Sequence, residues 1–177
     1  MKKIVFVLVL MLASLEVFSQ NTIKFLGIPI TGTKKEMIAK LEAKGYEYNS
    51  YGDYLTGEFN GQDVQIAVQT VNNRVWRIAV IDATGTNETN IKIRYNNLYD
   101  QFVNNGKYIS VGDGRLSENV DISYDINVKN KRFEADFALI DTSINGQVWY
   151  MIAEQYGSYR IVMFYENLDN AANGDDL

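Results

Sequence analysis

The chain has 177 residues, of which 46% are hydrophobic, 22% charged and 12% aromatic, and its net charge at pH 7 is −5. These proportions are ordinary for a globular protein and argue against a disordered, collagen-like or membrane-embedded chain. The sequence contains no cysteine and no histidine. It therefore excludes a Cys/His zinc site, a thiolate nucleophile, a Ser-His-Asp triad, a histidine-ligated haem and any disulfide within the chain.

The N-terminal segment has the three features of a secretory signal peptide. Two lysines begin it, an almost unbroken apolar run covers residues 4–13, and Val17 and Ser19 provide small residues at positions −3 and −1 of a cleavage site. This pattern predicts a signal peptide at residues 1–19 and a mature chain that begins at Gln20.

A membrane anchor is the alternative interpretation, but the apolar run is shorter than the ~20 residues that a spanning helix needs. The cleavage region also contains no cysteine to which a lipid could be attached. We therefore expect a periplasmic or secreted protein that is not lipid-anchored and does not insert into the membrane after cleavage. Removing residues 1–19 takes away two lysines and one glutamate, which leaves a net charge of −6 and disfavours nucleic-acid binding.

The first half of the mature chain is predicted to contain one helix and three strands. Residues 20–32 are an extended lead-in around the single proline. Thr33 and Glu36 have the spacing of a capping box, which predicts a helix over residues 34–44. Alternating apolar residues and two turn dipeptides, Asn60-Gly61 and Asn72-Asn73, then predict strands over 54–59, 64–69 and 74–81.

The second half repeats this plan with an additional strand. An apolar stripe predicts a helix over residues 88–104, and strands are predicted over 122–128, 133–139, 147–155 and 159–165. Lys129-Asn130 and Gly157-Ser158 are the predicted turns. The closing strands of the two halves are alike, since Trp-Arg-Ile-Ala-Val at 76–80 matches Tyr-Arg-Ile-Val-Met at 159–163.

These elements predict an α+β fold of two consecutive helix-plus-antiparallel-meander units, with the helices packed on one face of the sheet. The first unit covers residues 20–85 and the second covers 86–168. Residues 169–177 are small and acidic, which predicts a disordered tail.

Three sequence strings carry a resemblance to known proteins: Phe-Leu-Gly-Ile-Pro-Ile-Thr-Gly-Thr at 25–33, Lys-Gly-Tyr at 44–46 and Phe-Asn-Gly at 59–61. With them the chain resembles a group of uncharacterised secreted proteins from Bacteroidales. The tandem helix-meander arrangement also resembles the β-lactamase-inhibitor-protein-like fold, seen singly in small outer-membrane assembly lipoproteins. The resemblance implies a location and a fold, and no contact residue is carried over from it.

Four carboxylates of the second half are the only concentration of groups that suggests catalysis. Two carboxylates ~5 to 10 Å apart can hydrolyse a glycosidic bond, one as acid and the other as base or nucleophile. The alternative is that they are the solvated polar positions of neighbouring strands. We assign no catalytic residue, metal or cofactor, and expect the chain not to be an enzyme; the four carboxylates are Asp121, Asp125, Glu134 and Asp136.

Aromatic residues point to binding instead, because the chain contains twelve tyrosines and two tryptophans. Period-two alternation places ten residues on the face beneath the helices: Val64, Ile66, Trp76, Ile78, Phe133, Phe137, Tyr150, Ile152, Ile161 and Met163. The same alternation leaves nine residues on the open face: Gln65, Arg77, Glu134, Asp136, Trp149, Met151, Arg160, Val162 and Phe164.

The predicted binding site consists of five of these open-face residues: Arg77, Glu134, Trp149, Arg160 and Phe164. The alternative is that Trp149 and Phe164 pack under the loop at 141–146 or an inter-unit linker while the charges pair across strands. The expected function is a non-catalytic binding module whose partner is another extracytoplasmic protein. A carboxylate-based hydrolase of glycans and a structural envelope protein are the alternatives.

Overall fold

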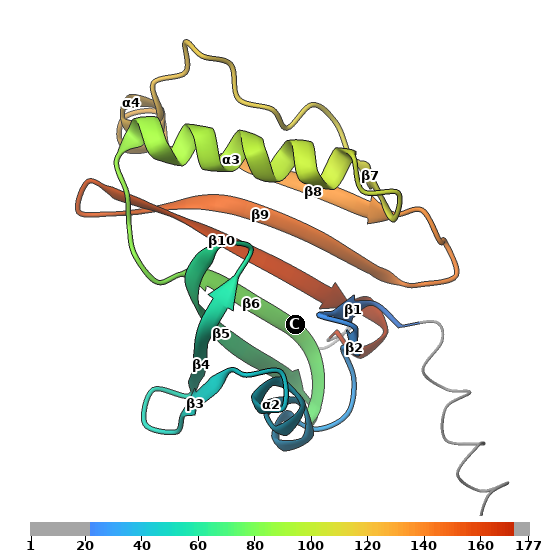
Figure 1. Ribbon diagram of the computed structural model, residues 1–177. Coiled ribbons are helices and arrows are strands. Elements are labelled where there is room, and N and C mark those ends of the chain that lie inside the picture. The colour runs from blue at the N-terminus through green and yellow to red at the C-terminus, as the bar shows by residue number, and fades with distance from the viewer. Residues whose placement is uncertain (1–21, 172–177) are drawn as a thin grey trace, which may run out of the picture.

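Residues 22–171 are described by the computed structural model, and they form a mixed α+β protein built on one large antiparallel sheet (Figure 1). The α+β class predicted from the sequence is confirmed. The predicted signal peptide and Gln20 lie outside the described residues, as do residues 172–177.

Eight strands form the sheet in the order β3-β4-β5-β6-β10-β9-β8-β7, and each pair of neighbours is antiparallel. Strands β3 to β6 run in sequence order from one edge of the sheet to its centre, and β7 to β10 run from the other edge, so that β6 and β10 are neighbours at the centre. The strands are β3 (Glu47–Asn49), β4 (Tyr54–Phe59), β5 (Gln62–Val71), β6 (Arg74–Asp82), β7 (Tyr108–Ser110), β8 (Glu134–Leu139), β9 (Gly146–Gln155) and β10 (Ser158–Asn167).

The first helix, α2 (Lys34–Glu42), begins where the capping box predicts. The Thr33 hydroxyl accepts a hydrogen bond from the Glu36 backbone N–H at 3.3 Å, and the Glu36 carboxylate accepts one from the Thr33 N–H at 2.8 Å. The predicted turns at 60–61 and 72–73 are also found, with positive φ at all four residues. These turns connect β4 to β5 and β5 to β6.

The second helix, α3 (Glu88–Val103), covers the β7–β10 half of the sheet (Figure 1). Its buried stripe consists of Ile91, Tyr95, Leu98 and Phe102. The Tyr95 ring packs edge-on against Tyr150 of β9 at 4.9 Å, and the Tyr150 hydroxyl donates a hydrogen bond to the Tyr95 carbonyl at 2.9 Å. Helix and sheet are thus joined by both an apolar and a polar contact.

The strand predicted over residues 122–128 is wrong, because this segment forms a short helix, α4 (Ile122–Asn127). The Asp121 carboxylate caps it by accepting a hydrogen bond from the Tyr124 N–H at 2.8 Å. Alternating apolar residues also match the i, i+4 spacing of a helix, so a short run does not distinguish the two structures. Asn130, predicted in a turn between two strands, instead lies with positive φ in the connection from α4 to β8.

Two edge strands, β3 and β7, were not predicted, and each has only three residues. Each half of the sheet therefore contains four strands. The last turn is shifted by one residue from its prediction, since positive φ occurs at Tyr156 and Gly157. Asp169 and Asn170, predicted to lie in a disordered tail, belong to the 3-10 helix η2 (Leu168–Asn170).

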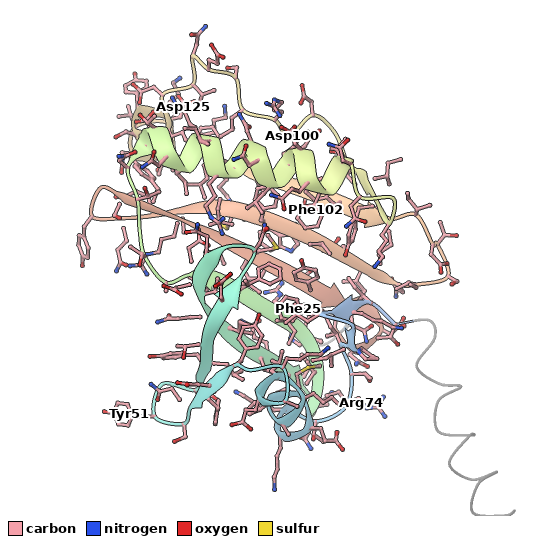
Figure 2. All side chains as sticks on the ribbon, viewed as in Figure 1. Phe25, Tyr51, Arg74, Asp100, Phe102 and Asp125 are labelled. Carbon is pink, nitrogen blue, oxygen red and sulfur yellow. The ribbon has the colours of Figure 1, made fainter. Side chains whose placement is uncertain are left out.

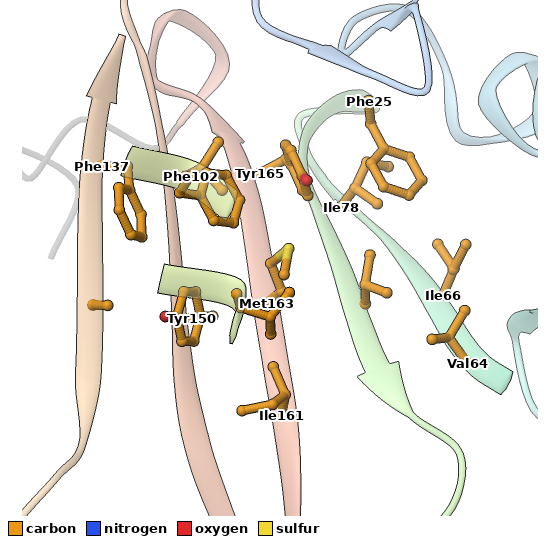
Figure 3. Close-up of a cluster of buried hydrophobic side chains, with 14 of the residues drawn as sticks. Phe25, Val64, Ile66, Ile78, Phe102, Phe137, Tyr150, Ile161, Met163 and Tyr165 are labelled. Carbon is orange, nitrogen blue, oxygen red and sulfur yellow. The ribbon is translucent and has the colours of Figure 1, made fainter. Parts of the chain in front are cut away.

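One face of the sheet carries the hydrophobic core, as period-two alternation predicts. Aromatic and aliphatic side chains from both halves meet there, and Figure 3 shows Ile66, Ile78, Tyr150, Ile161 and Met163 among them. The N-terminal hairpin of β1 (Lys24–Phe25) and β2 (Ile28–Pro29) adds Phe25, whose ring lies 5.0 Å from Tyr165. Among the described residues, no helix is long and apolar enough to span a membrane.

Candidate functional site

The opposite face of the sheet presents a set of cross-strand rows at its centre. Opposite residues in an antiparallel sheet lie close enough for their side chains to interact. The register of β6, β10 and β9 gives three such rows: Ile81–Val162–Met151, Ala79–Phe164–Trp149 and Arg77–Glu166–Gln147. Arg77, Trp149 and Phe164, three of the five residues of the predicted binding site, lie close together in these rows of the open face.

Trp76 was predicted to face the helices, and the structure corrects this placement. The β5–β6 register shifts at this point, since Gln69 pairs with Arg77 and Thr70 with Val75, which leaves Trp76 without a partner on β5. Such a bulge interrupts the alternation of side chains. Val75 consequently takes the fully buried position, and Trp76 lies beside Arg77.

Stacked rings and a guanidinium form the centre of the site. The Trp149 and Phe164 rings are nearly parallel, with centroids 4.2 Å apart. The Arg77 guanidinium carbon lies 4.0 Å from the Trp76 ring centroid and 5.0 Å from that of Phe164. A cation over aromatic faces is attracted by the negative charge of the rings. We call Trp76, Arg77, Trp149, Phe164 and Glu166 the open-face cluster.

Glu166 holds this cluster together, although the sequence analysis did not select it. It is 3% exposed, forms an ion pair with Arg77 Nη2 at 2.5 Å, and accepts hydrogen bonds from Trp149 Nε1 at 3.0 Å and Gln147 Nε2 at 2.6 Å. A buried carboxylate is tolerated only when donors of this kind compensate for its lost hydration. Because Glu166 follows Phe164 by two residues, alternation would have placed both on the same face, but the predicted strand ended at residue 165.

Arg77 Nε is buried and has no hydrogen-bond partner among residues 22–171. The cluster therefore contains one unsatisfied donor beside its satisfied carboxylate. A buried donor without a partner costs about 1–3 kcal/mol. The guanidinium is held by its ion pair with Glu166 and by the rings of Trp76 and Phe164.

The other two predicted site residues lie outside the open-face cluster. Glu134 belongs to β8, where it lies opposite Met151 of β9, and it forms an ion pair with Arg132 at 3.1 Å. Arg160 is opposite Ala153 and precedes Phe164 by four residues, which corresponds to about 13 Å along a strand. Both lie on the open face at a distance from the cluster.

The four carboxylates considered for hydrolysis are not gathered in one place. Asp121 caps α4, and Asp125 is bound by Lys129 at 2.7 Å and Lys131 at 3.5 Å; Figure 2 shows Asp125 at α4, near the first turn of α3. Only Glu134 and Asp136 share a strand and a face. Burial, with a smaller contribution from the charge of Glu134, raises the pKa of Asp136.

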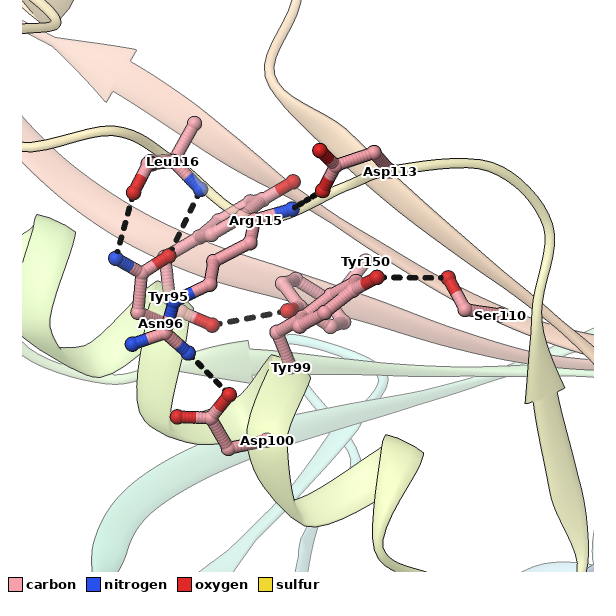
Figure 4. Close-up of polar contacts among 9 residues, drawn as sticks. All are labelled: Tyr95, Asn96, Tyr99, Asp100, Ser110, Asp113, Arg115, Leu116 and Tyr150. Carbon is pink, nitrogen blue, oxygen red and sulfur yellow. Dashed lines mark hydrogen bonds and ion pairs between the residues drawn. The ribbon is translucent and has the colours of Figure 1, made fainter.

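No group of three or more Asp and Glu side chains within residues 22–171 is arranged to hold a metal ion. A hydrogen-bonded segment, residues 110–116, runs along one side of α3 next to β8. Asn96 donates to the Leu116 carbonyl and accepts from its N–H, Arg115 pairs with Asp100, and Tyr99 is bonded to Ser110 (Figure 4). This segment covers one side of α3 and leaves Ile93 exposed, while the open-face cluster lies on the side of the sheet away from α3.

Neither a protein-family model nor a curated protein matches the sequence, and no solved structure matches the fold. The function proposed for this chain therefore depends on its own residues.

Proposed function

We propose that the mature chain is an extracytoplasmic, non-catalytic binding module that recognises another protein through the open face of its sheet. The observation that carries the proposal is the open-face cluster, in which two stacked rings and an arginine are held by a buried carboxylate. Tryptophan and arginine dominate the energy of protein interfaces, mostly near the interface centre. The cluster occupies such a central position on β6, β10 and β9.

A protein partner fits this surface better than a small molecule does. The neighbouring row of Ile81, Val162 and Met151 extends the apolar area across three strands and is half-buried. Arg160 and Glu134 provide charges at a distance from the cluster, as in the polar rim around an interface core. The partner expected is a protein with an apolar patch bordered by an acidic group opposite Arg160.

The location of the protein is part of the same proposal. Support comes from the lysine pair, the apolar run and the Val17/Ser19 spacing, which together are typical of a cleaved secretory signal peptide. The absence of cysteine near the cleavage point leaves no attachment site for a lipid anchor. We place the mature chain in the periplasm or outside the cell.

We also propose that residues 20–85 and 86–168 are two related helix-meander units. In each, a helix, α2 or α3, precedes four strands of the large sheet, although α4 separates β7 from β8 in the second unit; the fourth strands, β6 and β10, pair at the centre of the sheet. Val80 pairs with Met163, and these two residues end the similar segments 76–80 and 159–163. The pairing is therefore symmetrical about this point, as expected for two copies related by a two-fold rotation.

Site-specific photocrosslinking in the native cells tests the binding proposal. A benzophenone amino acid at Val162, on the open face, is expected to capture a partner, whereas the same group at Ile93, exposed on α3, does not. In a Trp149→Phe/Arg77→Lys background the capture should fall at least about tenfold, since each lost anchor costs about 1 kcal/mol or more. Equal capture from both positions, or capture unaffected by the double substitution, would contradict the proposal.

A carboxylate-based hydrolase of glycans is the second candidate, supported by the raised pKa of Asp136 beside Glu134. Release of reducing sugar from envelope glycans that disappears in Glu134→Gln and in Asp136→Asn would favour it. A structural envelope protein is the third. It is favoured if the chain neither captures a partner at Val162 nor releases sugar.

A further inference from the structure

A cavity of about 410 Å³ lies on the helical side of the sheet, away from the open-face cluster. It opens between the C-terminal half of α3, the end of β4 with its turn, and the last part of β10. Cavities that bind small molecules are usually about 300 to 1,000 Å³. The volume is therefore sufficient for a small ligand.

The floor of the cavity is aromatic and aliphatic. Phe59, Leu98, Phe102, Tyr108 and Met163 line it, and Figure 3 shows Phe102 close to Met163 and Tyr165. At the rim, Asn60 Nδ2 donates to Gln101 Oε1 at 3.0 Å and so joins the β4–β5 turn to α3. A mainly apolar floor with a few polar groups at the rim is typical of ligand pockets.

Tyr165 provides the polar group that points to a ligand. Tyr165 lines the cavity and is 7% exposed; no hydrogen bond from its hydroxyl to residues 22–171 is found, and the hydroxyl is not one of the fully buried atoms without a partner there. Two other core tyrosines have hydrogen-bonded hydroxyls: the Tyr150 hydroxyl donates to the Tyr95 carbonyl and the Tyr46 hydroxyl to the Glu58 carbonyl, both at 2.9 Å. Burial raises the pKa of Tyr165, so its hydroxyl keeps its proton and acts as a donor.

The charged residues that line the cavity indicate which kinds of ligand it can bind. Glu58 is the single ionisable acid there, and no lysine or arginine of the described chain contributes to the lining. An anion would have no cation to compensate for its lost hydration. Ring-shaped ligands are favoured because Phe59, Phe102 and Tyr108 offer ring faces and edges.

We propose that this cavity binds a small uncharged aromatic molecule whose carbonyl or hydroxyl oxygen accepts a hydrogen bond from Tyr165. The site is separate from the open-face cluster, since it lies on the other side of the sheet. The protein then has two binding surfaces, one for a protein and one for a small ligand.

Two probes of the same shape and different charge test the proposal, namely 4-methylbenzamide and 4-methylbenzoate. Their binding to the mature protein is followed by the NMR signals of ¹³C-labelled tyrosine and phenylalanine rings. The amide is expected to shift the signals of Tyr165, Phe102 and Tyr108, and the benzoate to bind at least about tenfold more weakly. Tyr165→Phe should weaken the amide about fivefold, as expected for one lost hydrogen bond of about 1 kcal/mol.

A second variant and a stability measurement exclude an effect on folding. Gln101→Trp places a large ring at the exposed rim and is expected to abolish binding without unfolding the protein. Because no hydrogen bond from the Tyr165 hydroxyl is found within residues 22–171, Tyr165→Phe should not lower the denaturation midpoint, whereas the matched Tyr150→Phe should. Equal binding of the two probes, no shift at Tyr165, or unchanged binding in Gln101→Trp would overturn the proposal.

Discussion

Arg77 of β6 and Glu166 of β10 face each other across the central strand pair, and Arg77 Nη2 lies 2.5 Å from Glu166 Oε1. The carboxylate is 3% exposed and the arginine side chain 24%. This ion pair joins the two halves of the chain at the point where their sheets meet. The same pair fixes the guanidinium against the Phe164 ring, so folding and the proposed binding site depend on one contact.

Replacing Glu166 by Gln should destabilise the fold by about 2 to 4 kcal/mol, because it leaves the largely buried Arg77 without its counter-charge. Urea denaturation followed by tryptophan fluorescence measures the change. Glu118→Gln, on an exposed loop, serves as the control and should cost less than ~0.5 kcal/mol. A midpoint for Glu166→Gln equal to that of the control would show that the pair does not stabilise the central strands.

Trp149 and Ile161 should respond differently to truncation, because they lie on opposite faces of the sheet. Ile161→Ala removes a side chain that is 1% exposed and should cost about 2 to 5 kcal/mol. Trp149→Ala should cost about 1.5 to 3 kcal/mol, since it loses the stack on Phe164 and the hydrogen bond to Glu166.

Trp149→Phe separates these two contributions. It keeps a ring over Phe164 and removes only the indole N–H, so a loss of about 1 kcal/mol is expected in the same denaturation experiment. A Trp149→Ala variant as stable as the unaltered protein would mean that the ring is held by neither contact.

Stability should fall as the pH rises above about 10. Burial raises the pKa of Tyr95, Tyr150 and Tyr165 above the ordinary value for a tyrosine, so the folded chain keeps protons that the unfolded chain loses above pH ~10. Each such tyrosine contributes a slope of up to about −1.4 kcal/mol per pH unit between its unfolded and its folded pKa.

Denaturation at a series of pH values between 8 and 11 measures this slope. Tyr150→Phe should lower the stability at pH 8, because it removes the hydrogen bond to Tyr95, and should also make the alkaline decline shallower. An alkaline slope that is the same in both proteins would contradict the assignment to buried tyrosines.

The mature protein is expected to begin at Gln20. Mass analysis of the N-terminal peptide from the extracytoplasmic fraction measures this directly. A Val17→Tyr/Ser19→Tyr variant should remain uncleaved, because a signal peptidase requires small residues at these positions. An intact Met1 in the membrane fraction of the unaltered protein would contradict the proposed location.

Long elements with a clear period were predictable from local chemistry. The capping box at Thr33, the apolar stripe of α3 and the Asn60-Gly61 turn each depend on residues a few positions apart, so the sequence contains all the information they need. The alternation in β9 and β10 likewise assigned Trp149 and Ile161 to opposite faces.

Tertiary contacts decided the structure of segments that are very short or whose periodicity fits both a helix and a strand. The segment 122–127 satisfies both strand and helix periods, and Asp121 together with burial of Ile122 selects the helix. Edge strands of three residues, such as β7, exist only because β8 lies beside them. Trp76 leaves its expected face because the bulge lies in the pairing of two strands, which no single strand reveals.

The residues of the candidate sites are likewise of two kinds: some were predictable from the local sequence, and others were decided only by the tertiary structure. By itself the sequence placed Arg77, Trp149 and Phe164 on one face, since side-chain alternation is a local property. Only the tertiary structure decided that β6 and β10 pair, which brings Glu166 to Arg77 from 89 residues away. The place of Tyr165 in the wall of the cavity is also decided only by packing, because burial is a property of the whole fold.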